Sequence, residues 1–85
     1  MRLKELWDAY KEAKVKTLEL EKQMKEEGPS MSRNDMWFAV YGNEWMAGQE
    51  VARELMVSYG YDTHEANRMV YRRPEEVEAL LQKVA

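Results

Sequence analysis

The stretch that decides the fold runs from Gln49 to Val84 and reads QEVARELMVSYGYDTHEANRMVYRRPEEVEALLQKV. Near its middle, Gly60 can adopt the left-handed conformation that ends a helix, because it has no Cβ. Asp62 can then cap the next helix, and Glu65 three residues later completes a capping box. Pro74 suits the first turn of a further helix. The stretch therefore predicts three short helices joined by two tight turns.

The segment from residue 2 to about residue 27 predicts a long amphipathic helix, because the good helix formers Glu, Lys, Leu and Ala dominate it. Apolar or small residues recur at spacings of three and four, as on an a/d seam: Leu3, Leu6, Tyr10, Ala13, Thr17, Leu20 and Met24. Trp7 is predicted beside this seam. Two interpretations are open: the helix packs on its own domain, or it forms the seam of a coiled-coil or helical-hairpin dimer.

Gly28-Pro29-Ser30 ends this first helix, and Ser32 or Asn34 is predicted to cap the second. Several apolar or small residues then fall near one helical stripe: Trp37, Tyr41, Trp45, Gly48, Ala52, Leu55 and Tyr59. Gly42 could break this helix. We therefore expect an all-α fold of four or five helices, with an amphipathic helix at residues 1–28 and a small helical bundle at residues 29–85.

The composition limits the classes of protein to which the chain can belong. It has 85 residues, which fit one small domain, and no Cys for disulfides or thiolate metal sites. Its 13 Lys and Arg against 16 Asp and Glu give a net charge of −3, which argues mildly against nonspecific binding to a polyanion. No apolar run approaches the ~20 residues of a membrane span, and no signal-peptide pattern is present. We expect a soluble cytoplasmic protein.

Seven Met and three Trp are more large apolar side chains than so small a chain is expected to bury. Met repacks easily, and Trp and Tyr anchor interfaces. We therefore predict a homo-oligomer whose interface lies along the N-terminal helix and the Trp37–Trp45 region. The predicted interface residues are Leu3, Leu6, Trp7, Tyr10, Leu20, Trp37 and Trp45.

The turn at Gly60 resembles the first loop of UBA (ubiquitin-associated) domains, which are three-helix bundles. Tyr59-Gly60-Tyr61-Asp62 followed by Ala66 has the spacing of the family's Met-Gly-Phe/Tyr loop, with Tyr59 in place of Met. Val77-Glu78-Ala79 and the residues after it align with the family's third helix. The resemblance covers residues 49 to 84 and implies a non-catalytic protein-binding module. It places the binding surface at the first loop and the last helix: Tyr59, Gly60, Tyr61, Leu81 and Val84.

The sequence offers little that indicates catalysis. His64, the only histidine, falls in the first turn of a predicted helix without a nucleophile placed beside it. The carboxylates alternate with Lys and have no metal-ligand spacing, and the four glycines do not form a phosphate-binding loop. We expect no enzymatic activity, no metal and no cofactor.

A helix, a short turn and a second helix are also the outline of a helix-turn-helix protein. In that alternative, a dimeric DNA-binding regulator would contact nucleic acid through Asn67, Arg68, Arg72 and Arg73. Glutamates at positions 65, 75, 76 and 78 dilute this positive charge. The sequence therefore favours an oligomeric protein-protein interaction module with a protein partner, and DNA binding is the alternative.

Overall fold

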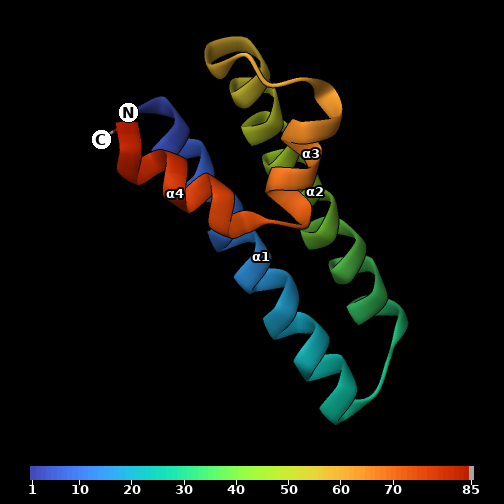
Figure 1. Ribbon diagram of the computed structural model, residues 1–85. Helices are drawn as coiled ribbons and strands as arrows, with labels where there is room; N and C mark the ends of the chain where they lie inside the picture. The colour runs from blue at the N-terminus through green and yellow to red at the C-terminus, as the bar shows by residue number, and fades with distance from the viewer. Residues whose placement is uncertain (85) are drawn as a thin grey trace.

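The computed structural model describes residues 1–84 and contains four α-helices within them (Figure 1). They are α1 (Arg2–Glu27), α2 (Met31–Tyr59), α3 (Thr63–Tyr71) and α4 (Pro74–Val84). No strand occurs among the described residues, and the prediction of an all-α fold is confirmed. Residue 85, the last of the predicted bundle, lies outside them. None of the four helices has both the length and the apolar character needed to cross a membrane.

The predicted helix boundaries around Gly60 are confirmed. Gly60 ends α2 in the left-handed conformation with φ 78°, and its N–H donates to the carbonyl of Leu55. The Asp62 side chain caps α3 by accepting a hydrogen bond of 2.8 Å from the N–H of Glu65. Pro74 is the first residue of α4. Local side-chain and glycine chemistry therefore determines the turns of this C-terminal half.

Two expectations for α2 are corrected. Its cap is Ser30, whose Oγ accepts from the N–H of Arg33 at 3.2 Å, in place of Ser32 or Asn34. Ser30 has extended backbone angles directly before the first helical residue, so it occupies the capping position. The helix also continues through Gly42. A single glycine costs a helix only about 1 kcal/mol, and the packing of α1 along α2 compensates for it.

α1 and α2 form an antiparallel hairpin. Arg2, at the start of α1, lies 3.6 Å from the carboxylate of Glu54 near the end of α2. Midway along the hairpin, the hydroxyl of Thr17 donates to the carbonyl of Val40 at 3.4 Å. The side chains of the a/d seam therefore pack against α2 of the same chain, as in the first of the two interpretations.

All four helices contribute to one hydrophobic core. Its buried members are Leu3, Trp7, Tyr10, Val51, Ala52, Leu55, Ala66, Met69, Val70 and Val77. α3 packs on the C-terminal half of α2, and α4 returns to α1, where the indole N–H of Trp7 donates to the carboxylate of Glu78 at 2.7 Å. The predicted parts 1–28 and 29–85 thus share this core, and α1 forms one of its walls.

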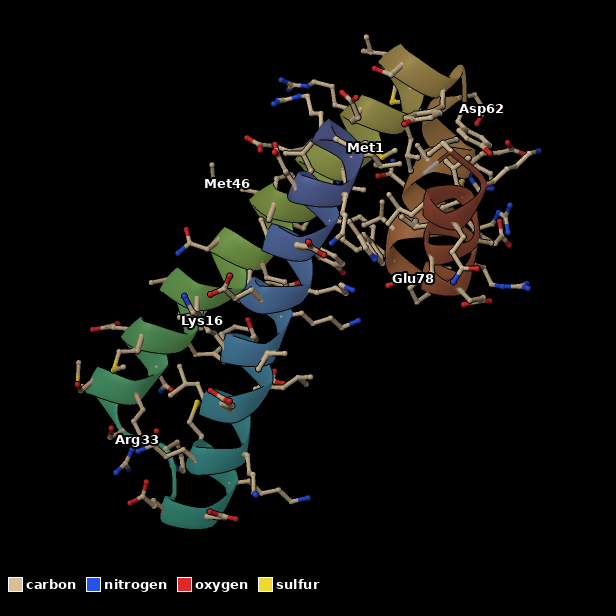
Figure 2. The ribbon with its side chains drawn as sticks, turned by 90° about the vertical axis from the view of Figure 1, so that its left-hand side faces the viewer. Met1, Lys16, Arg33, Met46, Asp62 and Glu78 are labelled. Carbon is tan, nitrogen blue, oxygen red and sulfur yellow. The ribbon has the colours of Figure 1, made fainter. Side chains whose placement is uncertain are left out.

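α3 and α4 lie beside only one end of the α1–α2 hairpin (Figure 1). The other end, which carries the loop between α1 and α2, is two helices thick, and the labelled residues Lys16 and Arg33 belong to it (Figure 2). We call this part, residues 14–46, the stem. It makes the molecule elongated, with principal extents of 43 × 21 × 20 Å.

Candidate protein-binding surface

One line of side chains on α2 runs from the core into the stem. Phe38, Tyr41, Trp45, Gly48 and Ala52 follow one another at spacings of three and four, so they share one side of the helix. Gly48 and Ala52 are buried. Phe38, Tyr41 and Trp45 remain 68%, 43% and 52% exposed. We call these three residues the aromatic stripe. The stripe lies on the same line of α2 side chains that α3 covers further along the helix, but the stripe itself is left uncovered.

Tyr71, the last residue of α3, marks the boundary between the covered and uncovered parts of this line. A Cβ at Gly48 would lie 2.6 Å from the Tyr71 hydroxyl oxygen, so glycine lets the ring lie against the helix. The Tyr71 hydroxyl donates to the carbonyl of Trp45 at 3.2 Å and accepts from the amide of Gln49 at 3.0 Å. Beyond the ring lies an open cleft of about 240 Å³ lined by Tyr41, Glu44, Trp45 and Tyr71.

Neighbouring rings restrict the movement of part of the stripe. Trp37 stacks on Tyr41 with ring centroids 4.9 Å apart and planes 6° apart. It meets Phe38 edge to face at 5.2 Å. The indole N–H of Trp37 donates to the carboxylate of Glu21 on α1 at 3.0 Å. Because these contacts already restrict the rings, a partner that binds them loses less side-chain entropy than it would with free side chains.

The surface around the stripe carries little charge. From Met36 to Gly48, Glu44 is the single charged residue of α2. In the same segment Met36 and Met46 are 54% and 62% exposed. A helix at the surface of a protein normally presents charged or polar side chains to solvent, opposite its buried face. This segment instead has the composition of an interface core, rich in aromatic residues and Met and poor in charge.

The structure changes the predicted oligomer interface. Leu3, Trp7, Tyr10 and Leu20 are at most 6% exposed, because the chain's own helices cover them, so they cannot form an open surface for a second copy. Leu6 and Trp37 are half-buried, and Trp45 is exposed. Of the seven predicted residues, Trp45 therefore belongs to the aromatic stripe and Trp37 supports it. The predicted interface residues did not include Phe38 and Tyr41, although their spacing from Trp45 could have identified them.

The residues singled out by the UBA resemblance divide between different surfaces. Tyr59 and Tyr61 are half-buried and pack against the core. Tyr61 borders a shallow groove with Leu80 and Lys83 of α4, and Gly60 is exposed at the turn. Leu81 faces a different groove, beside Trp7, and Val84 is 38% exposed. The tyrosines of the loop therefore attach the turn to the core.

Replacing Tyr61 with alanine is expected to lower the free energy of unfolding by about 2 kcal/mol, less than the 3–5 kcal/mol typical of a fully buried ring. Urea denaturation monitored by circular dichroism measures this loss. Val57→Ala, at a position on α2 that is 77% exposed, is the control and should change stability by less than about 0.5 kcal/mol. A Tyr61→Ala protein as stable as the control would show that the ring is a surface anchor.

The predicted nucleic-acid contacts lie together, but their charges are mostly paired. Both outer guanidinium nitrogens of Arg68 donate to the Glu76 carboxylate, at 3.1 and 3.3 Å. Arg73 donates to Glu75 at 2.7 Å. Asn67 accepts a hydrogen bond from Gln49, and Arg72 is exposed. Two of the three arginines thus have carboxylate partners from α4, which reduces the positive potential available to a phosphate backbone.

A second open groove lies between α1 and α4 and was not predicted. It has a volume of about 420 Å³ and contains the Trp7–Glu78 hydrogen bond described above. The bond from Trp7, and a second from Lys11 at 3.1 Å, lower the pKa of Glu78. The lining mixes charged and apolar side chains: Met1, Lys4, Trp7, Asp8, Lys11, Glu78, Leu81 and Gln82. These contacts attach α4 to α1.

Within residues 1–84, no three or more His, Asp or Glu side chains lie where they could hold a metal ion together. His64 is exposed and borders the groove of Asn67, Arg68, Tyr71 and Arg72. The most distinctive surface feature is therefore the aromatic stripe. Comparison of the chain with protein-family models, with curated proteins and with solved structures finds no match.

Proposed function

We propose that this protein is a non-enzymatic protein-protein interaction module that binds its partner through the aromatic stripe of the stem. The observation that carries the proposal is the exposure of Phe38, Tyr41 and Trp45 on one side of a continuous helix. Exposed aromatic rings held in place by neighbouring groups are typical of the residues that contribute most to binding energy.

The stem exposes further apolar side chains outside the stripe, which are Val15, Leu18, Met31, Met36 and Met46. A large exposed apolar area usually marks a protein or membrane interaction site. The lack of charge from Met36 to Gly48, apart from Glu44, fits a protein partner with an apolar surface. The resemblance of residues 49–84 to UBA domains implies the same class of function, protein binding.

DNA binding has weaker support from the side-chain contacts. Affinity for DNA depends on lysine and arginine side chains that neutralise phosphates. Arg68 and Arg73 are paired with glutamates of α4, and the chain has a net charge of −3. We therefore keep the interaction module as the proposed function.

Photo-crosslinking tests the proposal at a single residue. Phe38 is replaced by the photoreactive analogue p-benzoylphenylalanine, and the variant is irradiated both as purified protein and in extract of the source cells. The control carries the same analogue at Val57, which is 77% exposed and lies about 100° further around α2. We expect discrete adducts from position 38 that Trp45→Glu suppresses, and few from position 57. If position 38 gives no more adducts than position 57 in either sample, the proposal is wrong.

A further inference from the structure

We infer that the partner seated on the aromatic stripe is a second copy of this chain. In this arrangement α2 of one protomer packs on α2 of the other about a twofold axis. The two stems then form a four-helix bundle. The inference rests on the proposed function, because it names the partner of the same surface.

The solvent-exposed surface area of the chain supports a partner of the size of a second copy. The chain exposes 6025 Å², whereas a compact monomer of 10.1 kDa exposes roughly 5,300 Å². The excess of about 700 Å² is close to the ~800 Å² that each partner buries in a standard protein interface. A second copy that covers the stem would therefore remove about as much surface as this chain has in excess.

The shape of the stem indicates how the second copy packs on it. The radius of gyration is 14.6 Å, against about 12 Å for a compact domain of this length. The difference arises because α3 and α4 lie beside only one end of the hairpin, so the stem consists of two helices (Figure 1). Two helices can bury one line of side chains between them, but a second hairpin is needed to cover another side. Two hairpins packed face to face form a four-helix bundle, a common stable arrangement.

The charge on this surface is also compatible with self-association. A twofold contact brings each group close to its own copy on the partner, so a charged patch would repel itself. Phe38, Tyr41 and Trp45 carry no charge. Asp35 and Glu44 are the charged residues at spacings of three or four from them on α2, whereas Asn34, Gly42 and Gln49 at such spacings are uncharged. By contrast, the grooves beside α4 contain charged side chains from Lys4, Asp8, Lys11, Glu78 and Lys83. The stripe is therefore the surface best suited to contact its own copy.

The test compares two neighbouring substitutions on α2. Trp45→Glu places a charge in the stripe. Met46→Glu places the same charge at a residue that is 62% exposed and that points away from α3 and α4 (Figure 2). Light scattering on purified protein across a dilution series gives the mass of each variant. Circular dichroism confirms that each is folded. Phe38→Glu, at a position that is 68% exposed, replaces Trp45→Glu if that variant unfolds.

The expected results are a dimer of twice the 10.1 kDa chain mass for the unsubstituted protein and for Met46→Glu. Trp45→Glu or Phe38→Glu should be a folded monomer, with the dissociation constant raised at least tenfold. A monomeric unsubstituted protein at all concentrations up to hundreds of micromolar would overturn the inference, as would equal dissociation by Met46→Glu. If the protein is monomeric but position 38 still forms adducts with another protein in cell extract, the inference fails and the proposed function stands.

Discussion

Replacing Trp7 with alanine is expected to destabilise the fold strongly. Trp7 is the largest fully buried side chain and is 2% exposed. It packs on Tyr10 with ring centroids 5.4 Å apart, and its N–H bonds to Glu78 of α4. Truncation of a buried tryptophan costs about 3–5 kcal/mol, and small domains start from about 5–15 kcal/mol. Thermal and urea denaturation monitored by circular dichroism should show this loss, with the midpoint of thermal unfolding lowered by about 12–40 °C.

Trp7→Phe is the matched control, because it keeps an aromatic ring but loses the hydrogen bond to Glu78. It should remain folded and lose about 1–2 kcal/mol, the scale of a smaller ring combined with one lost bond. Glu78→Gln removes only the charge on the acceptor, and its effect should be smaller. A Trp7→Ala protein with nearly unchanged stability would mean that α4 does not pack on α1 as described.

Replacing Leu20 with glutamate has the second largest expected effect. Leu20 is 6% exposed and lies on α1 between Thr17 and Glu21, whose side chains form hydrogen bonds to α2. A carboxylate buried there without a partner costs several kcal/mol, so the stem should lose its helical structure. Circular dichroism should show less helix at 25 °C and a lower, broader thermal transition.

Leu18→Glu is the control, since Leu18 lies on the same helix, two residues away, and is 55% exposed. That variant should keep its helical content and change stability by less than about 1 kcal/mol. The pair also separates the two interpretations of the first helix. If Leu20 belonged to an intermolecular seam, Leu20→Glu would give a folded monomer with unchanged helical content.

The turns of this protein could be predicted from sequence because they depend on neighbouring residues. Gly60 and Asp62 end one helix and start the next through contacts that span only a few residues. The cap of α2 was misplaced for the opposite reason. Ser32 and Asn34 were predicted as caps, but the point at which the chain leaves Pro29 makes Ser30, two residues before Ser32, the capping residue.

The position of Trp7 could not be predicted from the heptad pattern alone. An a/d seam describes a helix with one neighbour, whereas the N-terminal half of α1 contacts both α2 and α4. Its buried sector is therefore wider than a seam and includes Trp7. The periodicity identified most of the remaining apolar face, because it contains Leu3, Tyr10 and Leu20.

The exposure of the aromatic stripe also depends on tertiary structure. The spacing of Tyr41, Trp45, Gly48 and Ala52 on α2 predicts one continuous line, and nothing in α2 indicates where its cover ends. The point on α2 at which this cover ends depends on α3, because α3 stops at Tyr71 shortly before Pro74. Sequence reasoning therefore found the line of side chains but not the part of it left open.

The central claim, that a second copy covers the aromatic stripe, is tested most directly by ¹⁹F NMR of protein labelled with 5-fluorotryptophan. The three tryptophans report on three environments, because Trp7 is buried, Trp37 is half-buried and Trp45 is 52% exposed within one chain. Substitution of each tryptophan by phenylalanine assigns the resonances. We expect the Trp45 resonance to shift on dilution and to become sensitive to the exchange of H₂O for D₂O, while the Trp7 resonance stays unchanged. A Trp45 resonance that is solvent-exposed and identical at every concentration would contradict the account.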